Sequence, residues 1–214
     1  YRVVVFKPFL STPDYCSLSN RDFNRKALLI GNSHADAIKS VFADAARAEG
    51  YIPIIAQENM NLDPHNFQTL VNVISEVNPS IVLFHSRGGT YDLSSMEKMF
   101  VFLSVRGIRG SILESVPEYT DSIPKRLLTE PESSFTPISE FGGVTNERSK
   151  LEFLTHKYGF VYITSKDVFC RNNYVCLVAD SNSLKPYYFD SNHLTLTGAA
   201  LLYEKLDSFF ASSN

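Results

Sequence analysis

Short apolar runs alternate along the chain with longer segments whose apolar residues follow a helical period. The short runs are nearly continuous in apolar character rather than alternating with polar residues. This pattern is typical of strands that are covered on both faces, as in a parallel sheet. Five runs predict strands: residues 27–31, 51–56, 80–85, 110–114 and 160–164.

The longer segments carry apolar stripes at helical spacing. In residues 35–49, for example, Ile38, Val41 and Phe42 share one face, and Gly50 follows as a stop signal. Five segments predict helices: 35–49, 66–77, 93–105, 146–158 and 197–210. The alternation predicts an α/β fold, a three-layer α/β/α sandwich around a doubly wound, mostly parallel sheet.

Residues 116–143 break this rhythm. The stretch holds several prolines and ends in the pair Gly142-Gly143. We therefore expect a long excursion with at most short helices. Excursions of this length in compact domains often shape a substrate site.

Composition narrows the class of protein without changing the predicted fold. Of 214 residues, 44% are hydrophobic and 20% are charged, which is ordinary for a globular protein of one domain. The net charge of −3 supplies no basic surface field, so nucleic acid is not expected as a partner. The longest apolar runs, such as 81–84, fall far short of the ~20 residues that cross a bilayer.

A candidate nucleophile lies where the first predicted strand meets the first predicted helix, in Gly31-Asn32-Ser33-His34. There Ser33 would stand at the carboxyl edge of a parallel sheet and at a helix N-terminus. Backbone N–H groups and the helix dipole favour negative charge at such a place, as acyl transfer requires. We expect Gly31 to let the backbone turn sharply. The alternative is structural, because serine is also a favoured N-cap.

A candidate acid–base pair lies near the other end of the chain. Asp190 and His193 are three residues apart, just before the last predicted helix. A carboxylate in that position can hold one imidazole nitrogen and leave the other to take a proton from a serine hydroxyl. The alternative is that Asp190 is only a turn residue and His193 a helix-start residue. In a doubly wound sheet both this loop and Ser33 can reach the carboxyl rim, where ligands bind.

These two segments resemble the first and last sequence blocks of the SGNH (GDSL-like) hydrolase superfamily. Gly31-Asn32-Ser33 is similar to its Gly-Asp-Ser block, and Asp190 with His193 matches its Asp-x-x-His block. The pattern resembles more narrowly the SGNH domains fused to acyltransferase-three membrane proteins, which O-acetylate bacterial surface polysaccharides such as O-antigen. The resemblance implies the SGNH fold with a flavodoxin-like five-stranded sheet, and a catalytic triad of Ser33, Asp190 and His193.

The resemblance also bears on the chain's organisation and on its cysteines. The first residue is Tyr1, and we expect a piece of a longer protein, with 1–26 as an N-terminal extension or linker packed on a catalytic domain, 27–214. Spacing alone leaves Cys170 and Cys176 open as a disulfide or as two free thiols. The resemblance favours the disulfide and a periplasmic location, where such bonds persist. The partner of Cys16 stays open.

The sequence departs from the superfamily in three places. Asn32 replaces the usual aspartate, which is not the nucleophile, so we expect little effect. No glycine occurs in residues 57–61, where the second block should supply an oxyanion donor. The third block, usually Gly-x-Asn-Asp, is replaced by residues 85–90, which begin His85-Ser86-Arg87.

The oxyanion site therefore lacks the donors that these two blocks usually supply. The backbone N–H of Ser33 survives as one donor, and the second is either the Arg87 guanidinium or a backbone N–H of Gly88 or Gly89. Arg87 has an alternative role as a salt-bridge partner on the rim. The remaining histidines show no ligand-like spacing, so we assign surface or packing roles and no metal to them: His34, His65, His85 and His156.

The leading hypothesis is a serine-dependent O-acetyltransferase domain. An acetyl group would pass through acyl-Ser33 to a sugar hydroxyl of a bacterial polysaccharide or a lipid-linked oligosaccharide. The resemblance implies no cofactor bound by this domain, with acetyl-CoA as the ultimate donor through a transmembrane acyltransferase domain of the same polypeptide. It implies the periplasmic face of an inner-membrane protein. Two alternatives remain: a carbohydrate esterase with the same triad, and a non-catalytic polysaccharide-binding module.

Overall fold

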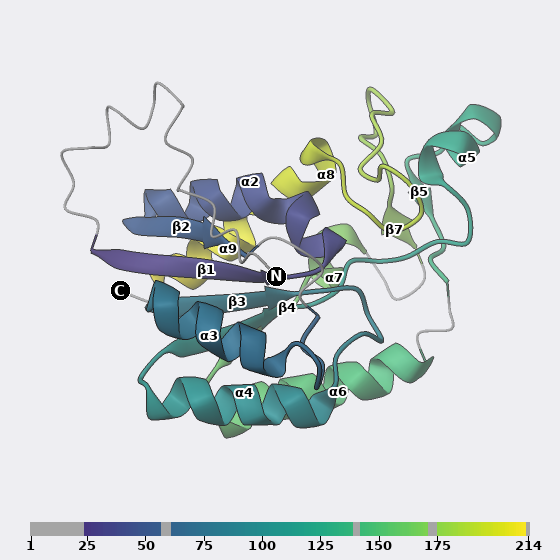
Figure 1. The fold of residues 1–214 in the computed structure, drawn as a ribbon. Helices are drawn as coiled ribbons and strands as arrows, with labels where there is room; N and C mark the ends of the chain where they lie inside the picture. The colour runs from purple at the N-terminus through teal and green to yellow at the C-terminus, as the bar shows by residue number, and fades with distance from the viewer. Residues whose placement is uncertain (1–23, 57–60, 139–141, 171–174, 213–214) are drawn as a thin grey trace.

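In the computed structural model, the described residues are 24–56, 61–138, 142–170 and 175–212, with the backbone alone for 142–145. Five parallel strands form the central sheet, in the order β2-β1-β3-β4-β6 (Figure 1). They are β1 (Arg25–Gly31), β2 (Tyr51–Ile55), β3 (Ile81–His85), β4 (Arg109–Leu113) and β6 (Val161–Ile163). The predicted parallel, flavodoxin-like sheet is confirmed, with the order reversing between β1 and β3.

The two central strands, β1 and β3, are buried along most of their length, as their continuous apolar character predicts. Their register pairs Gly31 with His85, so both strands end at the same level of the sheet. A Cβ at Gly31 would lie 1.8 Å from the carbonyl oxygen of His85. Glycine is therefore required here for the close approach of β3, rather than for the sharp turn that we predicted.

Helices cover both faces of the sheet (Figure 1). One core cluster includes Phe42 and Phe210, from the face covered by α2 (Ser33–Ala48), α8 (Leu196–Ala200) and α9 (Tyr203–Ala211). A second cluster includes Leu70, Phe100 and Leu154, from the face covered by α3 (Phe67–Val77), α4 (Leu93–Val105) and α6 (Gly142–Lys157). The sandwich therefore has two cores, one on each face of the sheet.

Two of the predicted helices differ from the structure by more than two residues. The segment predicted as one helix, 197–210, is two helices, α8 and α9, because the chain tightens between them. Leu201 and Leu202 donate to carbonyls only three residues back, those of Gly198 and Ala199. The pair Gly142-Gly143, expected in the excursion, instead begins α6.

The excursion after β4 is more ordered than its proline content predicts. It contains the helix α5 (Ile123–Thr129) and the strand β5 (Ser134–Phe135), which pairs antiparallel with β7 (Cys176–Leu177). The short helix α7 (Lys166–Phe169) follows β6. In Figure 1, α5, β5 and β7 lie beyond the carboxyl edge of the central sheet, next to the start of α8.

A disulfide joins Cys170 to Cys176 and ties the end of α7 to β7. Of the two alternatives that spacing left open, the structure therefore has the disulfide. Cys16 and most of the predicted extension 1–26 lie outside the described residues. Over the described ranges, no helix combines the length and the apolar character needed to cross a membrane.

Candidate functional site

Ser33 is the first residue of α2, and the residue before it caps the helix. Asn32 is extended, and its side-chain oxygen accepts a hydrogen bond of 3.0 Å from the backbone N–H of His34. The N-cap role that was an alternative for Ser33 is thus taken by Asn32. The Ser33 side chain is exposed at the carboxyl edge of the sheet and is free to make other contacts.

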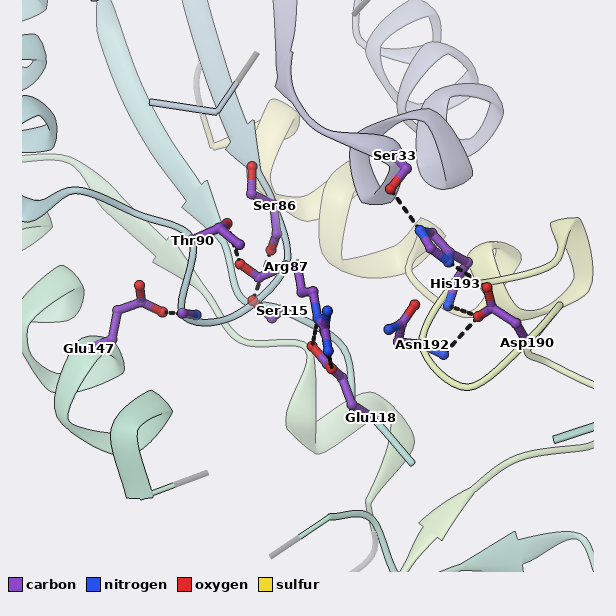
Figure 2. A network of polar contacts seen from close by, with 11 residues as sticks. Ser33, Ser86, Arg87, Thr90, Ser115, Glu118, Glu147, Asp190, Asn192 and His193 are labelled. Atoms are coloured by element: carbon purple, nitrogen blue, oxygen red, sulfur yellow. Dashed lines mark hydrogen bonds and ion pairs between the residues drawn. The ribbon is translucent and has the colours of Figure 1, made fainter. Parts of the chain in front are cut away.

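Ser33, His193 and Asp190 form a continuous hydrogen-bonded chain (Figure 2). The Ser33 Oγ lies 2.7 Å from Nε2 of His193, and Nδ1 of His193 lies 2.7 Å from Oδ2 of Asp190. Because an ionised carboxylate only accepts, Nδ1 carries the proton and Nε2 is left to accept from the serine hydroxyl. The structure therefore brings together the three side chains that the two motifs predict.

The loop that carries Asp190 and His193 is shaped by the aspartate itself. The Oδ1 of Asp190 accepts from the backbone N–H groups of Asn192 and His193, both at 2.8 Å. Partial burial of Asp190 acts to raise its pKa, but these two bonds and the contact with the His193 ring lower that pKa overall. Asp190 is therefore a carboxylate near neutral pH and can stabilise a positive charge on His193.

Segments before and after the loop hold it in place. Tyr188 and Leu194 form an antiparallel bridge, and Phe189 donates through its backbone to the carbonyl of His193. Thr195 then caps α8, with its hydroxyl accepting at 3.1 Å from the N–H of Gly198. A Cβ at Gly198 would lie 2.1 Å from the Tyr187 carbonyl oxygen, so only glycine allows α8 to pack this closely.

The excursion also supports this loop, a role that the sequence did not indicate. The backbone N–H of Tyr119 donates to the Ser191 carbonyl at 2.9 Å, and that of Ile123 donates to the Asp190 carbonyl at 3.0 Å. The predicted substrate-shaping excursion therefore contacts the site through its backbone.

Arg87 follows β3 and forms an ion pair with Glu118 of the excursion. Its Nε lies 3.0 Å and its Nη2 2.8 Å from Oε2 of Glu118 (Figure 2). The Glu118 side chain is 9% exposed and that of Arg87 is 51% exposed. The hydrogen bonds and the charge of Glu118 raise the pKa of Arg87 further, so the guanidinium stays charged. The salt bridge that was the alternative role for Arg87 is therefore present, and half of the Arg87 side chain remains exposed to solvent.

The other candidate donors lie in the same turn. The backbone N–H of Gly89 donates to Oε2 of Glu147 in α6 at 2.7 Å, and that of Tyr91 donates to Oε1 at 3.2 Å. The Gly89 N–H is therefore engaged with a carboxylate in this structure. Arg87 and Gly88 remain as candidates for the second oxyanion donor.

The segment corresponding to the second sequence block contacts the nucleophile turn. The Nδ2 of Asn32 donates to the Oδ1 of Asn61 at 3.1 Å. The other residues of that segment, 57–60, lie outside the described residues. Asn32, which replaces the usual aspartate, therefore both caps α2 and ties its start to the chain after β2.

Sequence reasoning missed three polar residues that shape this edge: Asn61, Glu118 and Glu147. Each contacts the site across a long stretch of sequence, and Glu118 and Glu147 lie in or just after the excursion. The only signal for Glu118 and Glu147 was the unusual length of that segment, and for Asn61 it was a place in residues 57–61, where the second block was expected. Within the described ranges, no group of three His, Cys, Asp or Glu side chains is placed to hold a metal ion.

Comparisons with known proteins identify the family of this chain and similar folds. The family model described as "SGNH domain (fused to AT3 domains)" matches residues 5–208. The periplasmic domain of a lipopolysaccharide acetyltransferase from Salmonella serovar Paratyphi A has a similar structure, with a TM-score of 0.69 and 20% identity, covering 94% of this chain and 90% of that one. No curated protein matches the sequence.

Two further solved structures have similar folds. A putative G-D-S-L family lipolytic protein from Desulfitobacterium hafniense has a TM-score of 0.59 and 13% identity, covering 86% of this chain and 99% of its own. A putative GDSL-like lipase from Parabacteroides merdae has a TM-score of 0.51 and 10% identity, covering 90% and 99%. At such low identity these likenesses show the fold alone.

Proposed function

Because this chain belongs to the family of SGNH domains fused to AT3 domains, we propose that it is a serine-dependent O-acetyltransferase domain. Its substrate would be a sugar hydroxyl of a bacterial surface polysaccharide, of the O-antigen kind. The observation that carries the proposal is the hydrogen-bonded chain from Ser33 through His193 to Asp190. These hydrogen bonds between Ser33, His193 and Asp190 favour catalysis over the alternative of a non-catalytic binding module.

In the first half-reaction, Nε2 of His193 removes the hydroxyl proton of Ser33 as Oγ attacks the acetyl carbonyl carbon. Asp190 stabilises the imidazolium that forms. The tetrahedral oxyanion then collapses, the bond to the donor's leaving group breaks, and His193 returns the proton to that group. The product is acetyl-Ser33, with His193 neutral again.

The oxyanion of this step needs donors that are already in place. The backbone N–H of Ser33 at the start of α2 is one. We assign the second to Arg87, because its side chain is half exposed and is oriented by three hydrogen bonds from Nε and Nη2 to Glu118. The backbone N–H of Gly88 is the remaining candidate. An arginine in place of the usual asparagine adds a full positive charge to the donor.

In the second half-reaction, a sugar hydroxyl gives its proton to His193 and its oxygen attacks the acetyl carbon. Collapse of the second tetrahedral intermediate breaks the bond to Oγ, and His193 protonates the Ser33 oxygen. The acetyl group leaves as a sugar ester and the free enzyme is restored. The domain needs no cofactor of its own for either step.

The setting of the reaction follows from the family. Fusion to AT3 domains supports a transmembrane acyltransferase domain as the partner in the same polypeptide. We propose that this partner passes acetyl groups from acetyl-CoA to Ser33 on the periplasmic face. Residues 1–26 would then be the linker packed on the catalytic domain, 27–214.

The second candidate is a carbohydrate esterase, in which water replaces the sugar hydroxyl. The hydrogen bonds from Ser33 through His193 to Asp190 support it equally, because the first half-reaction is the same. An activated acetyl ester, supplied with and without polysaccharide, separates the two functions. Acetylated sugar is expected from the transferase, whereas hydrolysis that is indifferent to sugar indicates the esterase.

The decisive variant is Ser33→Ala. We expect it to lose acetyl transfer and labelling by a fluorophosphonate, which forms a bond from Oγ to phosphorus and expels fluoride. The fold should be intact because the Ser33 side chain is exposed and does not cap α2. Mass spectrometry of the intact protein measures the adduct, and far-UV circular dichroism checks the fold. A labelled or fully active Ser33→Ala protein would refute the proposal.

A further inference from the structure

Two histidines lie beside the Ser33–His193–Asp190 chain and take no part in it. His34 follows Ser33 in α2 and is 2% exposed, and His85 ends β3 and is fully buried. The ring of His34 contacts that of His193, with centroids 4.7 Å apart and a tilt of 44°. It also meets the ring of His85 edge-on, at 6.2 Å. The imidazole of His34 therefore lies between the half-buried ring of His193 and the fully buried ring of His85.

The surroundings of His34 keep it uncharged. Burial, and then the nearby groups that can carry positive charge, His85, His193 and Arg87, lower the pKa of His34 to about 3, although Asp190 acts in the opposite direction. Burial lowers the pKa of His85 to about 4, against a hydrogen bond with the Leu113 carbonyl. Both rings are therefore neutral at the pH where His193 must act as a base.

Packing alone does not account for these side chains. The Nε2 atoms of His34 and His85 are buried without a hydrogen-bond partner among the described residues. A buried polar atom without a partner costs free energy, which an apolar side chain of similar volume would avoid. A function that uses a neutral imidazole in contact with His193 explains why such a residue follows the nucleophile.

We propose that His34 is a positioning residue, whose uncharged ring holds the imidazole of His193 toward Ser33 and favours its protonated form in the transition state. A neutral aromatic ring attracts a cation in contact with it, by an amount that corresponds to a factor of about 3–30 in rate. A charged ring in the same place would repel that cation. The inference rests on the proposed function, because it takes His193 to be the base.

The test replaces the ring without removing its volume. In His34→Leu, we expect kcat for 4-nitrophenyl acetate to fall about 3–30-fold, with KM changed less than about 2-fold. In the pH profile of kcat/KM, the acidic limb should move to lower pH by about 0.5–1.5 units, because the His34 ring no longer stabilises the His193 imidazolium. His34→Gln, polar but without a ring, should behave in the same way. His34→Phe should recover part of the loss in kcat.

The shift of the acidic limb can be assigned to His34 only if the other charged and titratable groups that face His34 and His193 are unchanged in these variants. They are Asp190 in the loop of His193, Arg87 after β3, and His85 in β3. The matched control is His65→Leu, at an exposed histidine outside the site, which should leave the limb in place. Expressing kcat per fluorophosphonate-labelled Ser33 removes any contribution from misfolded protein.

Three results would overturn the inference. In His34→Leu, they are an unchanged kcat and pH profile, or a loss of kcat without a shift of the acidic limb. In His34→Phe, it is the absence of any recovery of kcat. Ser33→Ala separates these failures from a failure of the proposed function. If Ser33→Ala is inactive while His34→Leu behaves as wild type, only the role of His34 is wrong. If Ser33→Ala is active, the proposed function itself fails.

Discussion

The site has two sides that are built in different ways. The first, called the nucleophile side after the proposed role of Ser33, consists of Ser33, His193 and Asp190 joined in a line by hydrogen bonds. Its carboxylate is oriented by backbone N–H groups two and three residues away. The β3 side, residues 87–89, is held by carboxylates from distant segments. Glu118 is 31 residues from Arg87, and Glu147 is 58 residues from Gly89.

This difference explains why one side is recognisable as a motif and the other is not. An aspartate that accepts from the backbone N–H groups two and three residues further on forms a local turn, so the spacing of Asp190 to His193 is constrained whatever the rest of the fold does. Arg87 depends on a partner that the fold supplies from far away, so the residues around it carry no fixed spacing. Three experiments can break or sharpen this comparison.

The largest effect is expected on the nucleophile side, from Asp190→Asn. The amide oxygen can still accept from the backbone, but its NH₂ group would face Nδ1 of His193 and favour the wrong tautomer. We expect kcat to fall about 10⁴-fold with little change in fold. Asp180→Asn is a matched control, because Asp180 also accepts from backbone groups two and three residues on. A loss of less than about 10-fold in Asp190→Asn would mean that His193 needs no carboxylate.

A smaller effect is expected on the β3 side, from removal of the Arg87 guanidinium. Because Arg87→Ala alone would leave the Glu118 carboxylate buried without its partner, we would combine it with Glu118→Gln. An oxyanion donor of this kind contributes about 10²–10³-fold to kcat. Arg47→Ala, which removes an exposed pair with Asp44, should have no effect. Unchanged kcat in the double variant, measured with 4-nitrophenyl acetate, would reduce Arg87 to a structural salt bridge.

The smallest effect concerns the two histidines, one next to each side of the site. Because their pKa values are lowered in the folded protein, the unfolded chain binds protons that the folded chain does not. The free energy of unfolding should be highest above about pH 6.5 and fall below it, by up to about 1.4 kcal/mol per pH unit for each histidine. His34→Leu should reduce this slope between pH 6 and pH 5, and His65→Leu should not. Urea unfolding at pH 7, 6 and 5 measures the free energy of unfolding at each pH. The same pH dependence of this free energy in wild type and in His34→Leu would contradict the prediction.

Much of the fold was predictable because its strands are covered on both faces. Each of the five predicted strands occurs within two residues of its predicted bounds, and α4 has the bounds that were predicted. The division of the last helix, and the pairing of β5 with β7, were not predictable. Both depend on how buried residues such as Leu202 and Cys176 pack against distant segments, and a hydrophobic pattern does not encode such contacts.

By itself, the sequence determined the fold class, the order of strands and helices along the chain, and the two short motifs that carry Ser33, Asp190 and His193, because hydrophobic period and short motif spacing are local properties. Only the tertiary structure decided the Cys170–Cys176 disulfide over free thiols, the pairing of Arg87 with Glu118, and the contact of His34 with His193. Such contacts form only once strands from distant parts of the chain end at a common edge, and no spacing along the chain records which side chains meet there.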